Sequence, residues 1–203
     1  MISTPTKRIY NAEISAGSLL LNESRIIAKL FLERPDEKTW HKAIIVDNVL
    51  QKKATSSAKR QARLIRNRLE LMPGELLELV VNGNREVAIQ ALFAAATKHS
   101  RLLGDFIDEV LRQHIKTFNT HLTVRDWENY FSDCEQRDKS LKKLSATTKK
   151  KLGQVVLRIL AEAKYIDNTR LLNLTPVHVA PEVYTVLANA GENYVLKCLE
   201  VYK

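Results

Sequence analysis

The residues whose type and spacing could do chemistry in this chain are lysines and arginines, gathered in two segments that contain no acid. Residues 51–69 hold seven basic side chains, and residues 139–161 hold seven more. The rest of the 203-residue chain has 18 basic residues against 23 acids, so the formal net charge of +9 comes from these two segments. Clustered cations of this kind attract anions, and phosphate is the natural candidate.

Each basic segment is expected to form a helix that buries one face and presents cations on the other. In the first helix the apolar arc is Ala58, Ala62, Ile65 and Leu69. In the second helix it is Leu152, Val155, Val156, Ile159, Leu160 and Ala163, and Lys149 lies nearer to this arc than its neighbours do. The predicted DNA-contacting residues are Lys52, Lys53, Ser56, Lys59, Arg60, Arg63, Arg66, Asn67, Lys142, Lys143, Thr147, Lys149, Lys150, Lys151, Gln154 and Arg158.

The placement of these cations favours double-stranded DNA as the partner. Cations in the first turns of a helix are disfavoured by ~0.3–1 kcal/mol each at low salt, and a bound phosphate reverses that cost. A helix that lies on a membrane surface would carry large apolar residues on the face opposite its cations. A protein that binds single-stranded nucleic acid would offer aromatic rings on which the bases stack. Neither basic segment contains an aromatic residue. Two alternatives stay open, namely a protein-protein adaptor that docks acidic surfaces and a helical RNA-binding protein.

No other pattern predicts catalysis or a cofactor. The six glycines form neither a phosphate-binding loop nor a dinucleotide fingerprint, and the five histidines show no spacing for a metal on one helix face. Cys134 lies between Asp133 and Glu135, which would raise its thiol pKa, the wrong direction for a nucleophile. We therefore expect a non-enzymatic protein without metal or cofactor, in which Cys134 and Cys198 are buried thiols.

The hydrophobic periodicity predicts an all-α, compact protein. Helices are expected over residues 18–34, from Asp36 through Val49, after residues 55–57, and over 75–81, 85–98 and 102–118. A helix that begins at Thr123, a short helix near 140–144 and a long helix after Ser145 then precede an extended segment at 171–179, which could form a short hairpin. This order resembles a winged helix-turn-helix. We expect an N-terminal region at 1–119 and a winged-helix-like region at 120–203, packed as one globule, each with a helix-turn-helix-like unit.

The longest stretches without a charge are too short to cross a membrane. Residues 87–97 and 171–181 are each 11 residues long, whereas a spanning helix needs about 20 apolar residues. The start of the chain, residues 1–8, has no apolar run typical of a secretory signal. We therefore expect a cytoplasmic protein without membrane insertion.

Two stretches of the sequence resemble the BrxA proteins of bacteriophage exclusion (BREX) systems. They are NAEISAGSLLLNESRIIAKLFL, which begins at Asn11, and VDNVLQKKATSSAKRQARLIRNRLELM, which spans Val46 to Met72. The resemblance runs along the whole chain, more sharply in the first half. It implies an accessory protein of a phage-defence system, with an all-helical fold and double-stranded DNA as ligand. The partner proteins that it implies are a methyltransferase, an ATPase and a phosphatase-like component.

Overall fold

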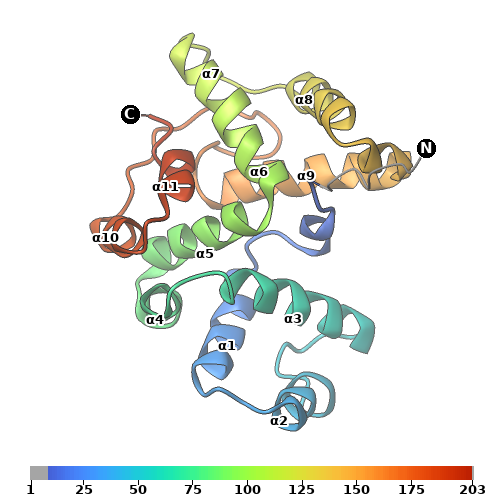
Figure 1. The fold of residues 1–203 in the computed structure, drawn as a ribbon, viewed down its shortest axis with the longest axis vertical. Helices are drawn as coiled ribbons and strands as arrows, with labels where there is room; N and C mark the ends of the chain where they lie inside the picture. Colours follow the sequence, from blue (N-terminus) through green and yellow to red (C-terminus); the bar gives the residue numbers. More distant parts are fainter. Residues whose placement is uncertain (1–8, 203) are drawn as a thin grey trace, which may run out of the picture.

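The computed structural model describes residues 9–202, which fold into packed helices, as the sequence predicts (Figure 1). In the N-terminal half these are η1 (Glu13–Ala16, a 3-10 turn), α1 (Leu21–Leu32), α2 (Glu37–His41), η2 (Lys42–Val46, a π-helical turn), α3 (Thr55–Leu69), α4 (Gly74–Asn82) and α5 (Arg85–His99). They are followed by α6 (Arg101–Asp105), η3 (Phe106–Leu111, π-helical), α7 (Arg112–Lys116), α8 (Val124–Arg137), η4 (Lys139–Lys143, a 3-10 turn), α9 (Ala146–Glu162), α10 (Pro181–Asn189) and α11 (Asn193–Leu199).

Polar residues cap several helices where the sequence places them. Asp36 accepts a hydrogen bond from the backbone N–H of Thr39 at 2.7 Å and begins α2. Thr123 and Asp126 form a reciprocal capping box at the start of α8, as predicted. The Ser145 hydroxyl accepts from the backbone N–H of Thr148 at the start of α9. Such caps satisfy backbone donors that a helix leaves free at its N-terminus, so they set where each helix begins.

The core is built around α5, which is buried along almost its whole length. Residues 91–96 of this helix are between 0% and 3% exposed, and small alanines there let neighbouring helices approach. Helices α3, α4, α6, α10 and α11 all pack against it. In Figure 1, α1, α2 and α3 form the lower part of the molecule, and α6 to α9 lie above α5. The C-terminal helices therefore share a core with the N-terminal half, and the division at residue 119 stays a prediction.

Several predicted boundaries are wrong for local reasons. The first helix begins at Leu21 and not at Ser18, because Leu20 adopts a left-handed backbone with φ of 54°. The second ends at Val46 in a π-helical turn, which leaves Val49 in a loop. In the segment 171–179 no two-stranded hairpin forms; Ile166 and His121 instead make isolated bridges to Leu174 and Asn173. Helices α10 and α11 are not predicted from the sequence.

Candidate nucleic-acid interface

Helix α3 buries the face that the sequence predicts. The side chains of Ala58, Ala62, Ile65 and Leu69 are each 1% exposed or less and belong to the core. The opposite side is open to solvent, and the predicted contact residues that lie exposed there or in the bend before the helix are Lys53, Ser56, Lys59, Arg60 and Arg63. Within the described part of the chain no carboxylate forms an ion pair with these four cations, which we call the α3 patch.

Helix α9 is held against α8 by a close contact at a glycine. A Cβ at Gly153 would lie 2.5 Å from the ring of Trp127, so only a glycine lets the two helices come so near. The predicted residues that remain exposed here are Lys142, Lys143, Thr147, Lys150, Lys151, Gln154 and Arg158. The five cations among them, which we call the α9 patch, also have no acidic partner among residues 9–202.

Three predicted contact residues have partners within the protein. Lys52 forms an ion pair with Glu23 of α1 at 2.6 Å, and both side chains are largely buried. Lys149 pairs with Glu135 of α8 at 2.5 Å, in keeping with its predicted position near the apolar arc. Asn67 donates a hydrogen bond to Glu13 at 3.3 Å. These contacts join separate elements of the fold and leave the side chains less available to a ligand.

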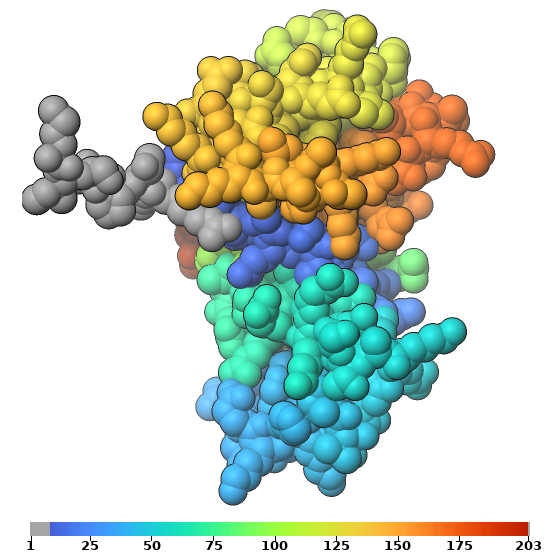
Figure 2. Space-filling view, turned by 90° about the vertical axis from the view of Figure 1, so that its right-hand side faces the viewer, coloured from blue at the N-terminus to red at the C-terminus, as the bar shows by residue number. Residues whose placement is uncertain are grey.

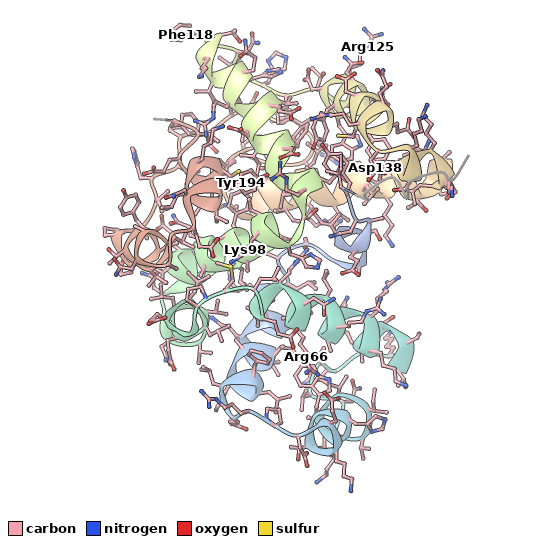
Figure 3. The ribbon with its side chains drawn as sticks, viewed as in Figure 1. Arg66, Lys98, Phe118, Arg125, Asp138 and Tyr194 are labelled. Carbon is pink, nitrogen blue, oxygen red and sulfur yellow. The ribbon has the colours of Figure 1, made fainter. Side chains whose placement is uncertain are left out.

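A fourth predicted contact residue, Arg66, links α3 to α2 in the lower part of the molecule (Figure 3). Its guanidinium contacts Glu70 at 2.7 Å and Glu37 at 3.1 Å, and lies 5.0 Å from the ring centre of Trp40. Hydrogen bonds to Glu70 and then to Glu37 raise the pKa of Arg66. This arginine is therefore a structural clamp between helices, although the wheel places it in the basic arc.

The structure adds a buried arginine, Arg68, for which no role is predicted from the sequence. Arg68 is 3% exposed and donates hydrogen bonds to the backbone carbonyls of Ser18 at 2.5 Å and Gly17 at 3.1 Å. Burial lowers the pKa of Arg68 to about 10, while the nearby charge of Glu162 opposes that shift. On the helical wheel Arg68 falls between the two arcs, so no sequence signal separates it from the surface cations.

Residues 9–20 lie between the two patches and are tied to both parts of the molecule. Figure 2 shows this segment in dark blue between α3, in teal, and α9, in orange, on one face of the protein. Glu162, at the end of α9, accepts hydrogen bonds from Ser18 Oγ at 2.7 Å and Leu19 N at 2.8 Å. Asp138, labelled in Figure 3, accepts from the backbone N–H groups of Ile9 and Tyr10 at 2.8 and 3.0 Å.

The environment of Asp138 favours its charged form. Burial alone would raise the pKa of this carboxyl, but hydrogen bonds from the backbone of Tyr10, Ser140 and Ile9 outweigh it and lower the pKa to about 2. The segment is thus fastened by a carboxylate that stays ionised at neutral pH.

The remaining residues whose chemistry could matter for function are the two cysteines and the possible metal ligands. Cys134 and Cys198 are free and buried, as predicted, and burial raises the pKa of both thiols, to about 12 for Cys198. Over residues 9–202 no three His, Cys, Asp or Glu side chains converge as metal ligands. None of the helices in this range is long and apolar enough to cross a lipid bilayer.

Fold and surface together define a small all-helical protein with two basic patches, carried by the helices α3 and α9 that Figure 2 shows on one face. The family model BrxA matches residues 8–191, and this chain belongs to the BrxA family. It is 45% identical to the BREX protein BrxA of Paramagnetospirillum magneticum, over 95% of this chain and 96% of that protein. It is 33% identical to the BREX protein BrxA of Escherichia coli, over 95% and 91% of the two chains.

A solved structure has the same fold. The crystal structure of an uncharacterized protein from Magnetospirillum magneticum superposes with a TM-score of 0.89 at 44% sequence identity, covering 97% of this chain and all of that one. The resemblance found in the sequence is therefore confirmed at the level of the family.

Proposed function

We propose that this protein is a non-enzymatic accessory component of a BREX phage-defence system that binds double-stranded DNA through the α3 and α9 patches. The observation that carries the proposal is the gathering of nine exposed cations without an ion pair into two patches; other exposed cations without an ion pair, such as Lys29 and Lys116, lie in segments that also contain acids. Elsewhere in the described chain, cations such as Lys52, Arg66, Arg112 and Arg137 pair with carboxylates. The nine cations of the two patches do not, although the chain has 23 acids available. An external polyanion completes their neutralisation.

The residue composition of each patch fits a DNA duplex better than it fits a membrane or a single-stranded nucleic acid. The apolar faces of α3 and α9 are used in the core, so neither helix has a free apolar face for a membrane. No aromatic side chain belongs to either patch, and the two rings that line the groove beside Lys150, those of Trp127 and Phe131, are each only 5% exposed, so neither is an open stacking platform for single-stranded bases. Lys and Arg with Thr147 and Ser56 contact phosphates, whereas Gln154 projects from α9 as a group able to reach a base edge. We expect low sequence specificity, because phosphate contacts dominate.

The elements around each patch fit helix-turn-helix-like units. In the C-terminal unit α8, η4 and α9 follow each other in the order of a winged helix, and α9 holds the position of the recognition helix. In the N-terminal unit α2 with η2 precedes α3, which holds that position. We propose that the regions 1–119 and 120–203 contribute one helix-turn-helix-like unit each.

Charge reversal tests this proposal. Arg60→Glu with Arg63→Glu should weaken binding to a fluorescent duplex at least tenfold, and Lys150→Glu with Lys151→Glu should do the same, with unchanged melting temperature. Lys116→Glu, an exposed cation outside both patches, serves as the matched control and should bind as the parent does. Equal affinity of all variants would refute DNA binding at these patches. Stronger competition by structured RNA than by duplex DNA would favour the RNA-binding alternative.

A second function, as an adaptor for the other defence proteins, is favoured by one apolar groove. This groove of about 560 Å³ lies between α8 and α9 and is lined by Trp127, Phe131 and Leu157, with Val124 58% exposed at its edge. The partners to test are the methyltransferase, the ATPase and the phosphatase-like component of the same system. Co-purification that survives nuclease treatment but is lost on Val124→Glu would support this role, and co-purification that nuclease abolishes would exclude it.

A further inference from the structure

We propose that the α3 and α9 patches bind one and the same DNA duplex, which lies across residues 9–20 between them. This inference rests on the proposed function and adds the geometry of binding to it. Two patches on opposite faces would bridge separate duplexes, whereas two patches on a shared face address one ligand. Figure 2 shows both helices on the same face, with the dark blue segment between them.

The separation of the two helices suits a single duplex. The short turn η1 packs against α3 on one side and against α9 on the other. Because neighbouring helices pack about 8–10 Å apart, the axes of α3 and α9 are at most about 20 Å apart across η1. The major groove of DNA is about 12 Å wide, and a phosphate backbone runs along each of its edges. Cations from the two helices can therefore reach both backbones of one duplex.

The surface between the patches is hollowed and edged by cations from both helices. A small pocket of about 110 Å³ is formed by Glu13, Ser15 and Ala16 with Arg60 and Arg63 of α3. A separate, larger pocket of about 450 Å³ lies along residues 18–23 and is bounded on the other side by Arg158 of α9. Arginines of α3 and of α9 thus edge hollows along the segment that joins the two patches.

The spacing of the two patches is fixed by hydrogen bonds to the same three residues. Arg68 of α3 donates to the carbonyls of Gly17 and Ser18. Glu162 of α9 accepts from the hydroxyl of Ser18 and the N–H of Leu19. Both basic helices are thus bonded to residues 17–19, so their relative position is set before DNA arrives. A preorganised pair of patches loses little entropy when one rigid duplex bridges them.

Glu13 is the exposed carboxylate on the surface that the duplex would cover; Glu23 and Glu162, which line the larger pocket, are already bonded to Lys52 and to Ser18 and Leu19 respectively. Glu13 is 45% exposed at its side chain and contacts His99 at 3.1 Å and Asn67 at 3.3 Å. Its charge repels phosphate, whereas a glutamine keeps an acceptor for both neighbours. Glu13→Gln should therefore bind duplex DNA a few fold more tightly than the parent. A lower or unchanged affinity would show that the duplex does not pass over η1.

The decisive experiment measures how many duplexes one protein holds. A 12-base-pair duplex in excess is mixed with the full chain, and the mass of the complex is read by sedimentation at low salt. We expect one duplex per protein. We then neutralise one patch at a time, with Lys59→Gln, Arg60→Gln and Arg63→Gln in α3 or Lys150→Gln, Lys151→Gln and Arg158→Gln in α9. Each variant should keep one duplex per protein, bind at least tenfold more weakly and show about two thirds of the parental salt slope, because six of the nine cations remain.

Other results overturn the inference in recognisable ways. If the parent binds two duplexes, and each variant binds only one of them with unchanged affinity, then the two patches are independent sites. An effect confined to one of the two variants would show that a single patch binds. In both cases the proposed DNA-binding function survives. A parent that binds no duplex at low salt would overturn that function as well.

Discussion

Asp138→Asn is expected to destabilise the protein by removing the charge that fastens residues 9 and 10. In the structure Asp138 Oδ2 accepts hydrogen bonds from the N–H groups of Ile9 and Tyr10, and Oδ1 accepts from Ser140 N at 2.9 Å. The carboxylate is 2% exposed. An asparagine has one carbonyl oxygen for three donors, and its amide group faces an N–H that it cannot bind. At least one buried donor is left without a partner.

Two independent arguments give the loss in the free energy of unfolding that Asp138→Asn causes. Hydrogen bonds to a charged acceptor contribute about 1.5–3 kcal/mol each, and the substitution removes one outright. The pKa of Asp138 falls from 3.8 to about 2 on folding, which corresponds to roughly 2.5 kcal/mol at ~1.4 kcal/mol per pKa unit. For a chain of this size, such a loss lowers the melting temperature by about 5–10 °C.

The pH dependence makes the assay specific. Because the pKa of Asp138 is lower in the folded state, the stabilisation is complete above about pH 4 and is lost as the pH falls through the folded value of about 2. Denaturant unfolding at pH 6 and at pH 2.5 should therefore show a large difference between parent and Asp138→Asn at the higher pH and a smaller one at the lower. Asp133→Asn, an exposed aspartate of α8, is the matched control and should behave as the parent. Equal stability of Asp138→Asn and parent at pH 6, or a difference that does not change with pH, would refute this reasoning.

The remaining predictions concern packing and the separation of structural from ligand-binding cations. Gly153→Ala should lower stability by about 1–3 kcal/mol in thermal unfolding, because its Cβ meets Trp127; Gly74→Ala has no neighbour within 4 Å and should not. Arg66→Met should lower the melting temperature because it breaks the clamp to α2, whereas Arg63→Met should lower DNA affinity alone; the reverse pattern would contradict the assignment. Cys134 and Cys198 should not react with an aromatic disulfide reagent until the protein unfolds, since both are buried.

Local patterns in the sequence predicted most of the helices and the two patches. The charge segments are continuous, and the apolar arcs of α3 and α9 follow from helix geometry, so neither requires knowledge of distant contacts. The capping box at Thr123 and Asp126 is likewise local.

Contacts between residues far apart in the chain could not be predicted. Lys52 and Arg66 each pair with a glutamate 29 positions away, on α1 and α2 respectively. Such partners become visible only when the helices are placed in space. The same holds for Arg68, because its burial depends on residues 17 and 18 lying over α3. The π-helical turns at 42–46 and 106–111 also cannot be predicted from a helical wheel, because the wheel assumes the same rotation for every residue.

The measurement that tests the central claim most directly is the affinity for a duplex between 50 and 200 mM salt. Log K should fall by about 0.9 per log unit of salt for each phosphate neutralised. With the nine unpaired cations of the α3 and α9 patches as the contact set, we expect a slope of roughly −6 to −8 and a loss of about 10³- to 10⁵-fold in affinity over this range. An affinity that stays flat over the same range would contradict DNA binding through these patches.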